Sequence, residues 1–550
     1  MIRDQIKKDL KKVVGGIVGK WDSGIEIVRQ DNPKFGDFST NLPLKIKREV
    51  KQTPMEIAKL LADSLKNLPY IKKLEVIEPG FVNFFIKDEV WQKQVGEVLS
   101  GRAKYGSNQI GKGKKARVEF VSANPTGPLH FGNARGGPIG DTLASVLEFC
   151  GYKVLREYID NDRGNQVLEL GKTLAIKAGL LDVKGEPLAY QGEYTQEVAA
   201  QIKKQIGDAK GLSQQEIIAK AGNLGVKILF EEIINDCVAM GIKYDNIVHE
   251  SELQKKAAQV LAELEKRKLL VKKEGALWFA PRLHSGQANE FLQDKDAVVV
   301  KSDGQYIYFT ADVVYHKEKF ESGYDLVVDI FGSNTIGHVS KLKALAGALG
   351  FDLSKFVVIL YQYVRIKRGN QIVKMSKRAG NFVTAREVLE EVGRDALRFF
   401  ILMHDVNSHI DFDLDLAKKK SSDNPVFYVQ YAHARICSIL QKAKRLTTNA
   451  KQKPLTVNCE LLTSSFELDL IKQISRLPEL VEDIAQTFAV HRLTTYATDL
   501  ADSFHRFYEN CPVLTAENDL KDARLALIRA CQIALANTLT LLGISAPEKM

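Results

Sequence analysis

A histidine and an asparagine three residues apart, His130 and Asn133, stand in the segment of the sequence best suited to chemistry. They lie in a Pro- and Gly-rich stretch, residues 122–135, that disfavours regular structure at its start. Gly132 lets a flat ring or a phosphate approach the backbone closely. A neutral hydrogen-bonding pair at a helix start suits stabilisation of a phosphoryl transition state without a lysine. The alternative is a Pro/Gly turn that carries an incidental surface histidine.

The elements that must position this pair flank it on both sides. Residues 116–121 alternate and are rich in β-formers, so they predict a strand. Apolar residues then recur at helical spacing from Ile139 to Cys150, and Gly151 ends the helix. Residues 154–159 predict a second strand. This β-loop-α-β unit is typical of a parallel doubly wound sheet, in which ligands lie beyond the carboxyl ends of the strands. The loop is neither a Walker loop nor a GxGxxG fingerprint.

A second motif follows another predicted strand, Phe356–Val364, and reads Lys374-Met375-Ser376-Lys377-Arg378. Together with Pro-Leu-His-Phe-Gly-Asn at 128–133, it resembles the paired signatures of class I aminoacyl-tRNA synthetases, His-Ile-Gly-His and Lys-Met-Ser-Lys-Ser. The remaining sequence resembles the arginyl-tRNA synthetase family within that class. This resemblance runs from Gly36-Asp37 to residues 546–550, and residues 424–435 resemble arginyl enzymes rather than other class I members.

The resemblance implies an α/β fold with three parts. A doubly wound parallel Rossmann-type catalytic sheet is expected at 116–392, with a helical insertion at about 167–275 and the signature loop at 374–378. From the residue pattern, the sheet is expected to resume after the insertion with strands at 276–279, 297–301, 306–309 and 326–331, and a helix is predicted from Pro54 to Leu65. An N-terminal α+β module at 1–115 would contact the tRNA, and a C-terminal all-helical domain at 393–550 would bind the anticodon stem and loop. In the insertion, Tyr190 and Tyr194 either stack on a base or pack the insertion itself.

The resemblance further implies a ligase that attaches L-arginine to tRNA(Arg) at the expense of ATP, through arginyl-adenylate. Mg²⁺ is expected to travel with ATP, because it binds through phosphates rather than a protein cage. The catalytic residues would be His130, Asn133, Lys374 and Lys377. The residues expected to contact ATP are Pro128, His130, Gly132, Asn133, Gly332, Asn334, Met375, Ser376 and Lys377.

Recognition of arginine needs carboxylate or carbonyl acceptors that match a planar guanidinium. Asp312 stands at a predicted strand-to-helix junction, where substrate groups are expected. By resemblance, the residues that contact arginine are Asn83, Ser122, Asn124, Tyr308 and Asp312. Two alternatives stay open: Asn83 is an Asx residue in a strand-end turn, and Asp312 caps its own helix.

Two departures from the family pattern weigh on this interpretation. Asn133 replaces the second histidine of the first signature, which keeps a donor but loses titration. Residues 332–338 read Gly-Ser-Asn-Thr-Ile-Gly-His where the bacterial pattern is Gly-Ala-Asp-His-His-Gly-Tyr. The rival hypotheses are a class I synthetase for another amino acid and a non-catalytic RNA-binding relative; the presence of His130, Lys377 and Asp312 argues against the second.

Composition agrees with a nucleic-acid partner. The chain has 550 residues and a formal net charge of +10, and residues 1–115 hold 23 Lys and Arg against 14 Asp and Glu. No apolar run reaches the length of a membrane helix, and we expect no secretory leader. The six cysteines show no CxxC spacing, so we expect a reducing cytoplasm, no metal site and no disulfide framework. We expect a monomer.

Overall fold

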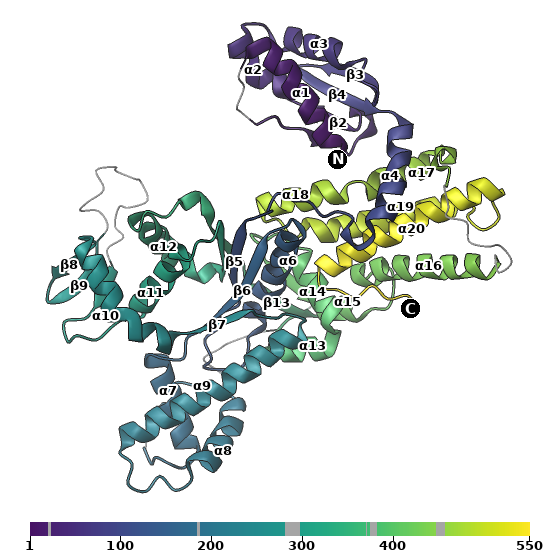
Figure 1. Ribbon diagram of the computed structural model, residues 1–550. Helices are drawn as coiled ribbons and strands as arrows, with labels where there is room; N and C mark the ends of the chain where they lie inside the picture. The colour runs from purple at the N-terminus through teal and green to yellow at the C-terminus, as the bar shows by residue number, and fades with distance from the viewer. Residues whose placement is uncertain (20–23, 184–186, 281–296, 370, 374–381, 447–456) are drawn as a thin grey trace.

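The computed structural model describes residues 1–19, 24–183, 187–280, 297–369, 371–373, 382–446 and 457–550. Figure 1 shows three parts: an N-terminal module, a central body built on a sheet, and a bundle of long helices that holds the C-terminus.

The N-terminal module combines three helices with a four-stranded antiparallel sheet of order β1-β2-β4-β3. The predicted helix after Pro54 forms because Thr53 and Glu56 make a capping box at its start. Its apolar face buries Ile57 and Leu61 completely. The elements are α1 (Ile2–Val18), β1 (Val28–Arg29), β2 (Phe38–Thr40), α2 (Leu42–Val50), α3 (Pro54–Leu65), β3 (Ile71–Ile77) and β4 (Phe81–Ile86).

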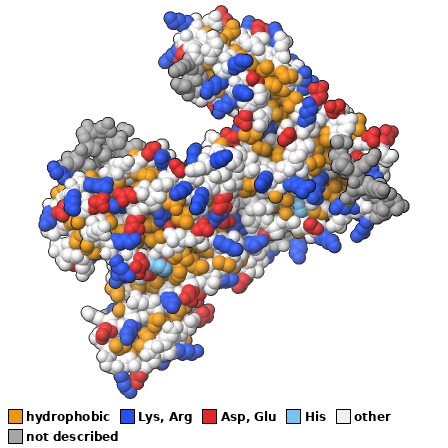
Figure 2. Space-filling view, in the orientation of Figure 1, with side chains coloured by type: hydrophobic (Ala, Val, Ile, Leu, Met, Phe, Trp, Pro, Cys, Tyr) orange, Lys and Arg blue, Asp and Glu red, His pale blue; other side chains and the backbone are white. Residues whose placement is uncertain are grey.

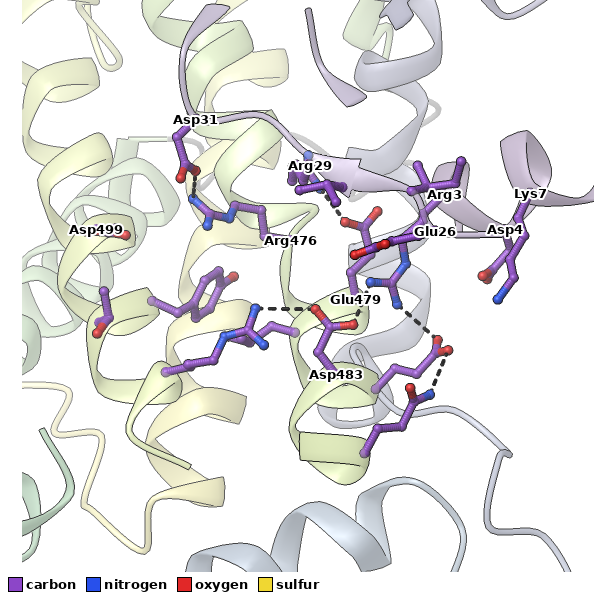
Figure 3. A pocket seen from close by; sticks show the side chains of 18 of the residues that line it. Arg3, Asp4, Lys7, Glu26, Arg29, Asp31, Arg476, Glu479, Asp483 and Asp499 are labelled. Atoms are coloured by element: carbon purple, nitrogen blue, oxygen red, sulfur yellow. Dashed lines mark hydrogen bonds and ion pairs between the residues drawn. The ribbon is translucent and has the colours of Figure 1, made fainter. Parts of the chain in front are cut away.

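The module is joined to the helical bundle in two ways. Helix α4 (Asp88–Gly101) leaves the module and packs against the bundle helices α17 (Ser465–Ile474) and α20 (Asn518–Leu541). Ion pairs also reach from the module to α18 (Leu477–Thr487): Arg3 lies 2.6 Å from Asp483, and Arg29 lies 3.0 Å from Glu479 (Figure 3). They border a cavity of about 580 Å³ between the two parts.

The central body is a five-stranded, fully parallel sheet of order β12-β11-β5-β6-β7. Because the chain passes from β5 to β6 on one side and to β11 and β12 on the other, the order reverses at β5, as in doubly wound sheets. The predicted α/β class is confirmed, and the strands predicted at 116–121, 154–159, 326–331 and 356–364 contribute to this sheet. The strands are β5 (Lys115–Phe120), β6 (Lys153–Asp160), β7 (Asn246–His249), β11 (Leu326–Gly332) and β12 (Phe356–Tyr361).

The segment expected to interrupt the sheet, 167–275, contains one of its strands. Residues 246–249 pair in parallel with β6, from Glu157 opposite Asn246 to Asp160 opposite His249. The prediction that residues 167–275 interrupt the sheet is therefore wrong at β7. This strand has only four residues, and none of them is fully buried, so no sequence pattern marks it. The helices of this region are α7 (Asn165–Lys177), α8 (Tyr194–Ile206), α9 (Gln214–Ala239) and α10 (Glu250–Lys266).

The strands expected to resume the main sheet after 275 form a separate sheet instead. β8 (Leu270–Lys273), β9 (Ala276–Phe279) and β10 (Ala297–Val300) pair antiparallel. Residues 306–309, expected to be extended, include the start of helix α11 (Tyr308–Glu321). Phe309 of that apolar run is buried together with Val313 and Val314 on one face of the helix, whereas Tyr306 stays exposed. Helix α12 (Ile336–Ala348) follows β11.

The remaining chain forms a small sheet and the bundle. β13 (Val364–Arg368) pairs with β14 (Gln371–Ile372) and, in parallel, with β15 (Ile410–Asp413). The helices between and after them are α5 (Phe131–Ala134) and α6 (Gly136–Phe149) in the first signature region, then α13 (Ala385–Val392), α14 (Arg394–Leu402), α15 (Leu414–Lys418), α16 (Pro425–Leu446), α17 (Ser465–Ile474), α19 (Arg492–Asn510) and α20 (Asn518–Leu541). Within the described ranges, no helix is long and apolar enough to cross a membrane.

Candidate active site

A cleft of about 560 Å³ opens at the carboxyl ends of the main strands, where the sequence placed the ligands. Its walls come from the loop after β5, the start of α7, helix α11, the end of β11 and the insertion tyrosines Tyr190 and Tyr194. The cleft thus gathers side chains that are far apart in the chain. The predicted site residues that line it are Ser122, Asn124, Pro128, His130, Asn133, Asp312, Gly332 and Asn334.

Of the remaining predicted residues, Asn83 is not brought into this cleft. Asn83 lies in β4 of the N-terminal module, 3% exposed, opposite Ser39 and Glu75 in the neighbouring strands. Gly132 lies one residue from the cleft wall in α5, and Tyr308 begins α11, its side chain outside the described atoms. Lys374, Met375, Ser376 and Lys377 lie outside the described residues.

His130 is held in a defined orientation. It is the N-cap of α5, and its Nδ1 accepts a hydrogen bond from the backbone N–H of Gly132 at 2.9 Å. Its ring proton is therefore on Nε2. A Cβ at position 132 would lie 3.0 Å from Nδ1, so glycine permits this contact. The ring stacks on Phe382, with the centroids 5.6 Å apart.

The chain just after the second signature holds the first signature in place. The Phe131 N–H donates to the Val383 carbonyl at 3.1 Å, and the Ala385 N–H donates to the Leu129 carbonyl at 2.8 Å. On the other side, the hydroxyl of Tyr361 at the end of β12 donates to the Asn133 carbonyl at 3.2 Å. The first signature is therefore adjacent in the fold to the segment that follows the second, although about 240 residues separate the two signatures in the sequence.

The loop after β5 has a strained backbone. Val121 and Ser122 both have positive φ, at 70° and 39°. For residues other than glycine, each such conformation costs on the order of 1–3 kcal/mol and persists only where the surroundings enforce it. Here the Tyr158 hydroxyl donates to the Ala123 carbonyl at 2.8 Å, and Asn124 exchanges side-chain hydrogen bonds with residues 161 and 166. The strain turns Ser122 and Asn124 into the cleft.

Asp312 supplies negative charge to the opposite wall. It is the fifth residue of α11 and makes no cap, so the alternative that it caps its own helix is wrong. The residue is 9% exposed, and among the described residues its Oδ2 has no hydrogen-bond partner. His338 Nε2 lies 3.1 Å from this oxygen, at ion-pair distance but without hydrogen-bond geometry. The carboxylate is thus available to a cationic ligand.

Glu250, which the sequence analysis missed, adds a second carboxylate near Asp312. It opens α10 at the carboxyl end of β7, is 3% exposed, and has one oxygen without a hydrogen-bond partner. Burial raises its pKa to about 7, and the charges of Asp312 and Asp162 add to the shift. A cation bound here would reduce the repulsion between the two carboxylates by neutralising negative charge. Recognition of 246–249 as a strand would have placed Glu250 at the ligand edge of the sheet.

Asp160, Asp162 and His249 lie near this corner, with one polar atom of each within 4.8 Å of the others. The hydrogen bonds of these three side chains are to one another and to other protein groups. His249 Nδ1 contacts Asp160 Oδ2 at 2.9 Å, and Asp162 accepts from the backbone N–H and the hydroxyl of Ser251 at 2.8 and 2.6 Å. These contacts join the ends of β6 and β7. Burial raises the pKa of Asp160 to about 6.

The end of β11 shapes the remaining wall. Gly332 is followed by a short 3₁₀ turn, Ser333–Thr335, and the Thr335 hydroxyl donates to the Gly332 carbonyl at 2.8 Å. A Cβ at position 332 would lie 2.7 Å from Asn334 Oδ1, so a larger residue would displace Asn334 from the cleft. The segment that departs from the family pattern, 332–338, thus begins with a compact turn.

This fold and this site define a class. A parallel sheet whose strand ends carry a His-x-x-Asn loop, held against the segment that follows a Lys-Met-Ser-Lys motif, is the catalytic architecture of class I aminoacyl-tRNA synthetases. Residues 94–410 match the family model for the class I (R) tRNA synthetase catalytic domain.

The flanking parts identify the branch of that class. Residues 1–86 match the arginyl tRNA synthetase N-terminal domain, and residues 429–550 match the DALR anticodon binding domain. The chain is 40% identical over 570 aligned residues to an arginine–tRNA ligase of Geobacter sp. (strain M21), covering all of both chains. It is 41% identical over 529 residues to that of Moorella thermoacetica, covering 94% of this chain and 92% of the relative. The chain belongs to the arginyl-tRNA synthetase family.

A solved structure shows the same fold. The arginyl-tRNA synthetase of Thermus thermophilus superposes with a TM-score of 0.79 over 100% of both chains, at 22% identity.

Proposed function

We propose that this chain attaches L-arginine to tRNA(Arg) at the expense of ATP, through arginyl-adenylate. The observation that carries the proposal is the polarity of the cleft. The cleft wall presents the ring of His130, which is oriented by its bond to Gly132, and the buried carboxylate of Asp312, whose charge also acts on the nearby Glu250. Among the described residues, one oxygen of each carboxylate has no hydrogen-bond partner. A substrate with a cationic side chain and a reacting carboxylate fits between His130 and these carboxylates.

In the first step, an oxygen of the arginine carboxylate attacks the α-phosphorus of ATP, and the bond to the β-phosphate breaks to release pyrophosphate. Such chemistry needs positioning and charge stabilisation rather than a covalent enzyme group. His130 Nε2–H would donate to an α-phosphate oxygen, and Asn133 beside it would offer its amide. Lys374 and Lys377 would bind the β- and γ-phosphates. Mg²⁺, carried on those phosphates, would neutralise charge there.

The nucleotide would extend from His130 along the end of β11. Pro128, Gly132, Gly332 and Asn334, with Met375 and Ser376 of the second signature, are the proposed remaining contacts of ATP. The compact turn at 332–335 supports a place for the adenosine, because Asn334 offers an amide at the cleft wall.

For arginine, Asp312 and Glu250 would accept from the guanidinium, whose planar fork matches carboxylates. Asn124 lines the cleft beside them, and Ser122 forms the turn that presents it. The proposed contacts of Tyr308 and Asn83 with arginine rest on the family resemblance alone.

In the second step, a ribose hydroxyl of the 3′-terminal nucleotide attacks the adenylate carbonyl, and AMP leaves. Two surfaces support tRNA binding. Lys and Arg side chains are spread over the N-terminal module, as Figure 2 shows. In the bundle, Arg435 lies over the rings of Tyr508 and Tyr431, 4.5 and 5.9 Å from their centroids, and Tyr431 is 41% exposed. Such a platform suits stacking on unpaired bases of an anticodon loop.

Domain roles, assembly and location complete the proposal. We assign tRNA contact to residues 1–115, catalysis to 116–392 and anticodon binding to 393–550. We propose a monomer that works in the cytoplasm.

The test is aminoacylation by the purified full chain with labelled arginine, ATP, Mg²⁺ and tRNA(Arg). We expect acid-stable label in tRNA that depends on ATP and is not formed with lysine. Binding of tRNA without transfer of any amino acid would contradict the proposal and favour a non-catalytic RNA-binding relative. Transfer of a different amino acid would favour another specificity.

A further inference from the structure

Helix α6 follows the first signature directly and lies very close to the sheet. A Cβ at Gly140 would lie 2.2 Å from the Phe120 ring on β5, and a Cβ at Gly137 would lie 2.6 Å from the Ile242 side chain. Glycine at both positions therefore permits the close approach. Ridges of side chains normally determine how a helix packs. Because the glycines present no ridge, packing at this end of α6 does not by itself fix the helix along its axis.

One buried guanidinium holds this end of α6. Arg398 of α14 donates from Nη2 to Oδ2 of Asp141, in the second turn of α6, at 2.7 Å. Arg398 has no exposed surface, so its charge depends on this carboxylate. Burial lowers the pKa of Arg398 below its usual value, and the charge of Asp141 opposes that shift. Helix α14 also packs against the bundle helix α16, so the contact joins the central body to the bundle (Figure 1).

The remaining donors of Arg398 bind the C-terminal ends of two other helices. Nε donates to the Leu542 carbonyl at 2.7 Å, and Nη1 donates to the Met240 carbonyl at 3.1 Å. Leu542 is the C-cap of α20, and Met240 is the C-cap of α9. Carbonyls at the end of a helix lack partners within it and carry partial negative charge, so both suit a guanidinium. Gly543 leaves room for the contact, because a Cβ there would lie 2.4 Å from the guanidinium.

We propose that Arg398 is a positioning residue for adenylate formation. Through Asp141 it fixes α6 along its axis, relative to the ends of α9 and α20. A single residue joins α6 to α5, so a shift of α6 would move His130 and Asn133 relative to the α-phosphate. Neither Arg398 nor Asp141 lines the cleft, and the effect on the rate is therefore exerted through position. The inference rests on the proposed function, because it assigns His130 and Asn133 to the transition state.

Arg398→Lys tests this in the full chain. Lysine keeps the positive charge, but one ammonium group cannot hold Asp141 and both carbonyls in the planar geometry of a guanidinium. We expect kcat for adenylate formation, measured as pyrophosphate exchange with tRNA(Arg) present, to fall at least about 10-fold. The KM values for arginine and ATP should change less than about twofold, because a misplaced donor is felt mainly in the transition state. An unchanged kcat, or a loss confined to tRNA affinity, would overturn the inference.

Arg524→Lys is the matched control. Arg524 in α20 donates to Glu467 at 2.7 Å and to the Pro512 carbonyl at 2.6 Å, so it also combines a buried carboxylate with a backbone carbonyl. All three residues belong to the bundle. The substitution should lower the melting temperature and leave kcat for adenylate formation unchanged. An equal fall of kcat in Arg524→Lys and Arg398→Lys would show general destabilisation and overturn the inference.

Coupling between Arg398 and Asp141 gives a second readout. Asp141→Ala should lower kcat for adenylate formation about 10-fold in the wild-type chain but less than about twofold in the Arg398→Lys background, because the bond is already lost. Arg156, the other cation near Asp141, keeps its partner Glu148 at 2.6 Å. The same factor in both backgrounds would overturn the inference. If Arg398→Lys does not fold, Asp141→Ala decides alone, and a wild-type kcat would overturn it.

These outcomes are ratios to the wild-type chain. They are therefore distinct from failure of the proposed function, in which the wild type itself would form no arginyl-adenylate.

Discussion

Asp312→Asn tests the assumption on which the proposed arginine recognition depends most, that the buried carboxylate of Asp312 binds the guanidinium. The substitution keeps the size, removes the charge and places an amide donor where the substrate also donates. A hydrogen bond to a charged partner contributes about 1.5–3 kcal/mol. Asp312 is only 9% exposed, so water screens the pair little and the upper end applies. About 3 kcal/mol corresponds to a fall of about 10²-fold in kcat/KM for arginine.

The assay is steady-state aminoacylation with arginine varied at saturating ATP and tRNA, beside thermal unfolding. We expect the fall in kcat/KM to appear mainly as a higher KM for arginine, while the KM for ATP stays near the wild-type value. The melting temperature should hold or rise, because the wild-type oxygen Oδ2 is buried without a hydrogen bond. Glu318→Gln, an exposed acidic residue of the same helix paired with Lys256, is the control and should change neither constant. Normal use of arginine by Asp312→Asn, together with lower stability, would refute the reasoning.

Three further predictions address the other parts. Lys377→Ala should leave tRNA affinity intact and slow adenylate formation by about 10²-fold, the scale of one lost transition-state contact; near-normal single-turnover activation would exclude that role. The affinity for tRNA should fall steeply with salt, and removal of residues 1–86, which spares the packed helix α4, should flatten the slope of log affinity against log salt; an unchanged slope would place the basic footprint elsewhere. Burial lowers the pKa of His433 below its usual value, so its contribution to stability is present above about pH 6.5 and is lost as pH falls through the lowered pKa. His433→Gln should therefore weaken the loss of melting temperature between pH 7 and 5, and equal losses in both proteins would contradict this.

The sequence was informative where the chemistry depends on local spacing. The β-prone run before His130, the apolar run before the second signature and the strand at 326–331 predicted β5, β12 and β11, since alternation and buried runs mark strands directly. These strands place His130, Asn133 and Gly332 at one edge of the sheet, and that edge is the cleft. Asp312 was also expected near the ligands and lines the cleft, although it lies inside α11 rather than at the strand-to-helix junction that the sequence predicted.

What the sequence did not reveal depends on contacts between distant residues. β7 is four residues long with no fully buried position, so neither alternation nor an apolar run marks it. Because β7 was not predicted, Glu250, which follows it, was not predicted as a site residue either. The positive φ of Val121 has no sequence signal, because a β-branched residue there argues for a strand. Glu119 and Lys319 are 200 residues apart in the sequence, and only the folded chain brings the lysine of α11 to within 2.6 Å of the carboxylate on β5.

The electrostatics of the cleft explain why arginine would bind in one orientation only. Asp312 and Glu250 are buried and close enough to shift the pKa of Glu250 upward, so the empty corner is unfavourable for two negative charges. A guanidinium neutralises them, whereas the substrate carboxylate at the same corner would add a third. At the other end, His130 offers a donor and no acceptor, because its Nδ1 is occupied by Gly132. On the proposed function, the reacting carboxylate would therefore be directed toward the α-phosphate by repulsion from Asp312 and Glu250 and by hydrogen bonding to His130.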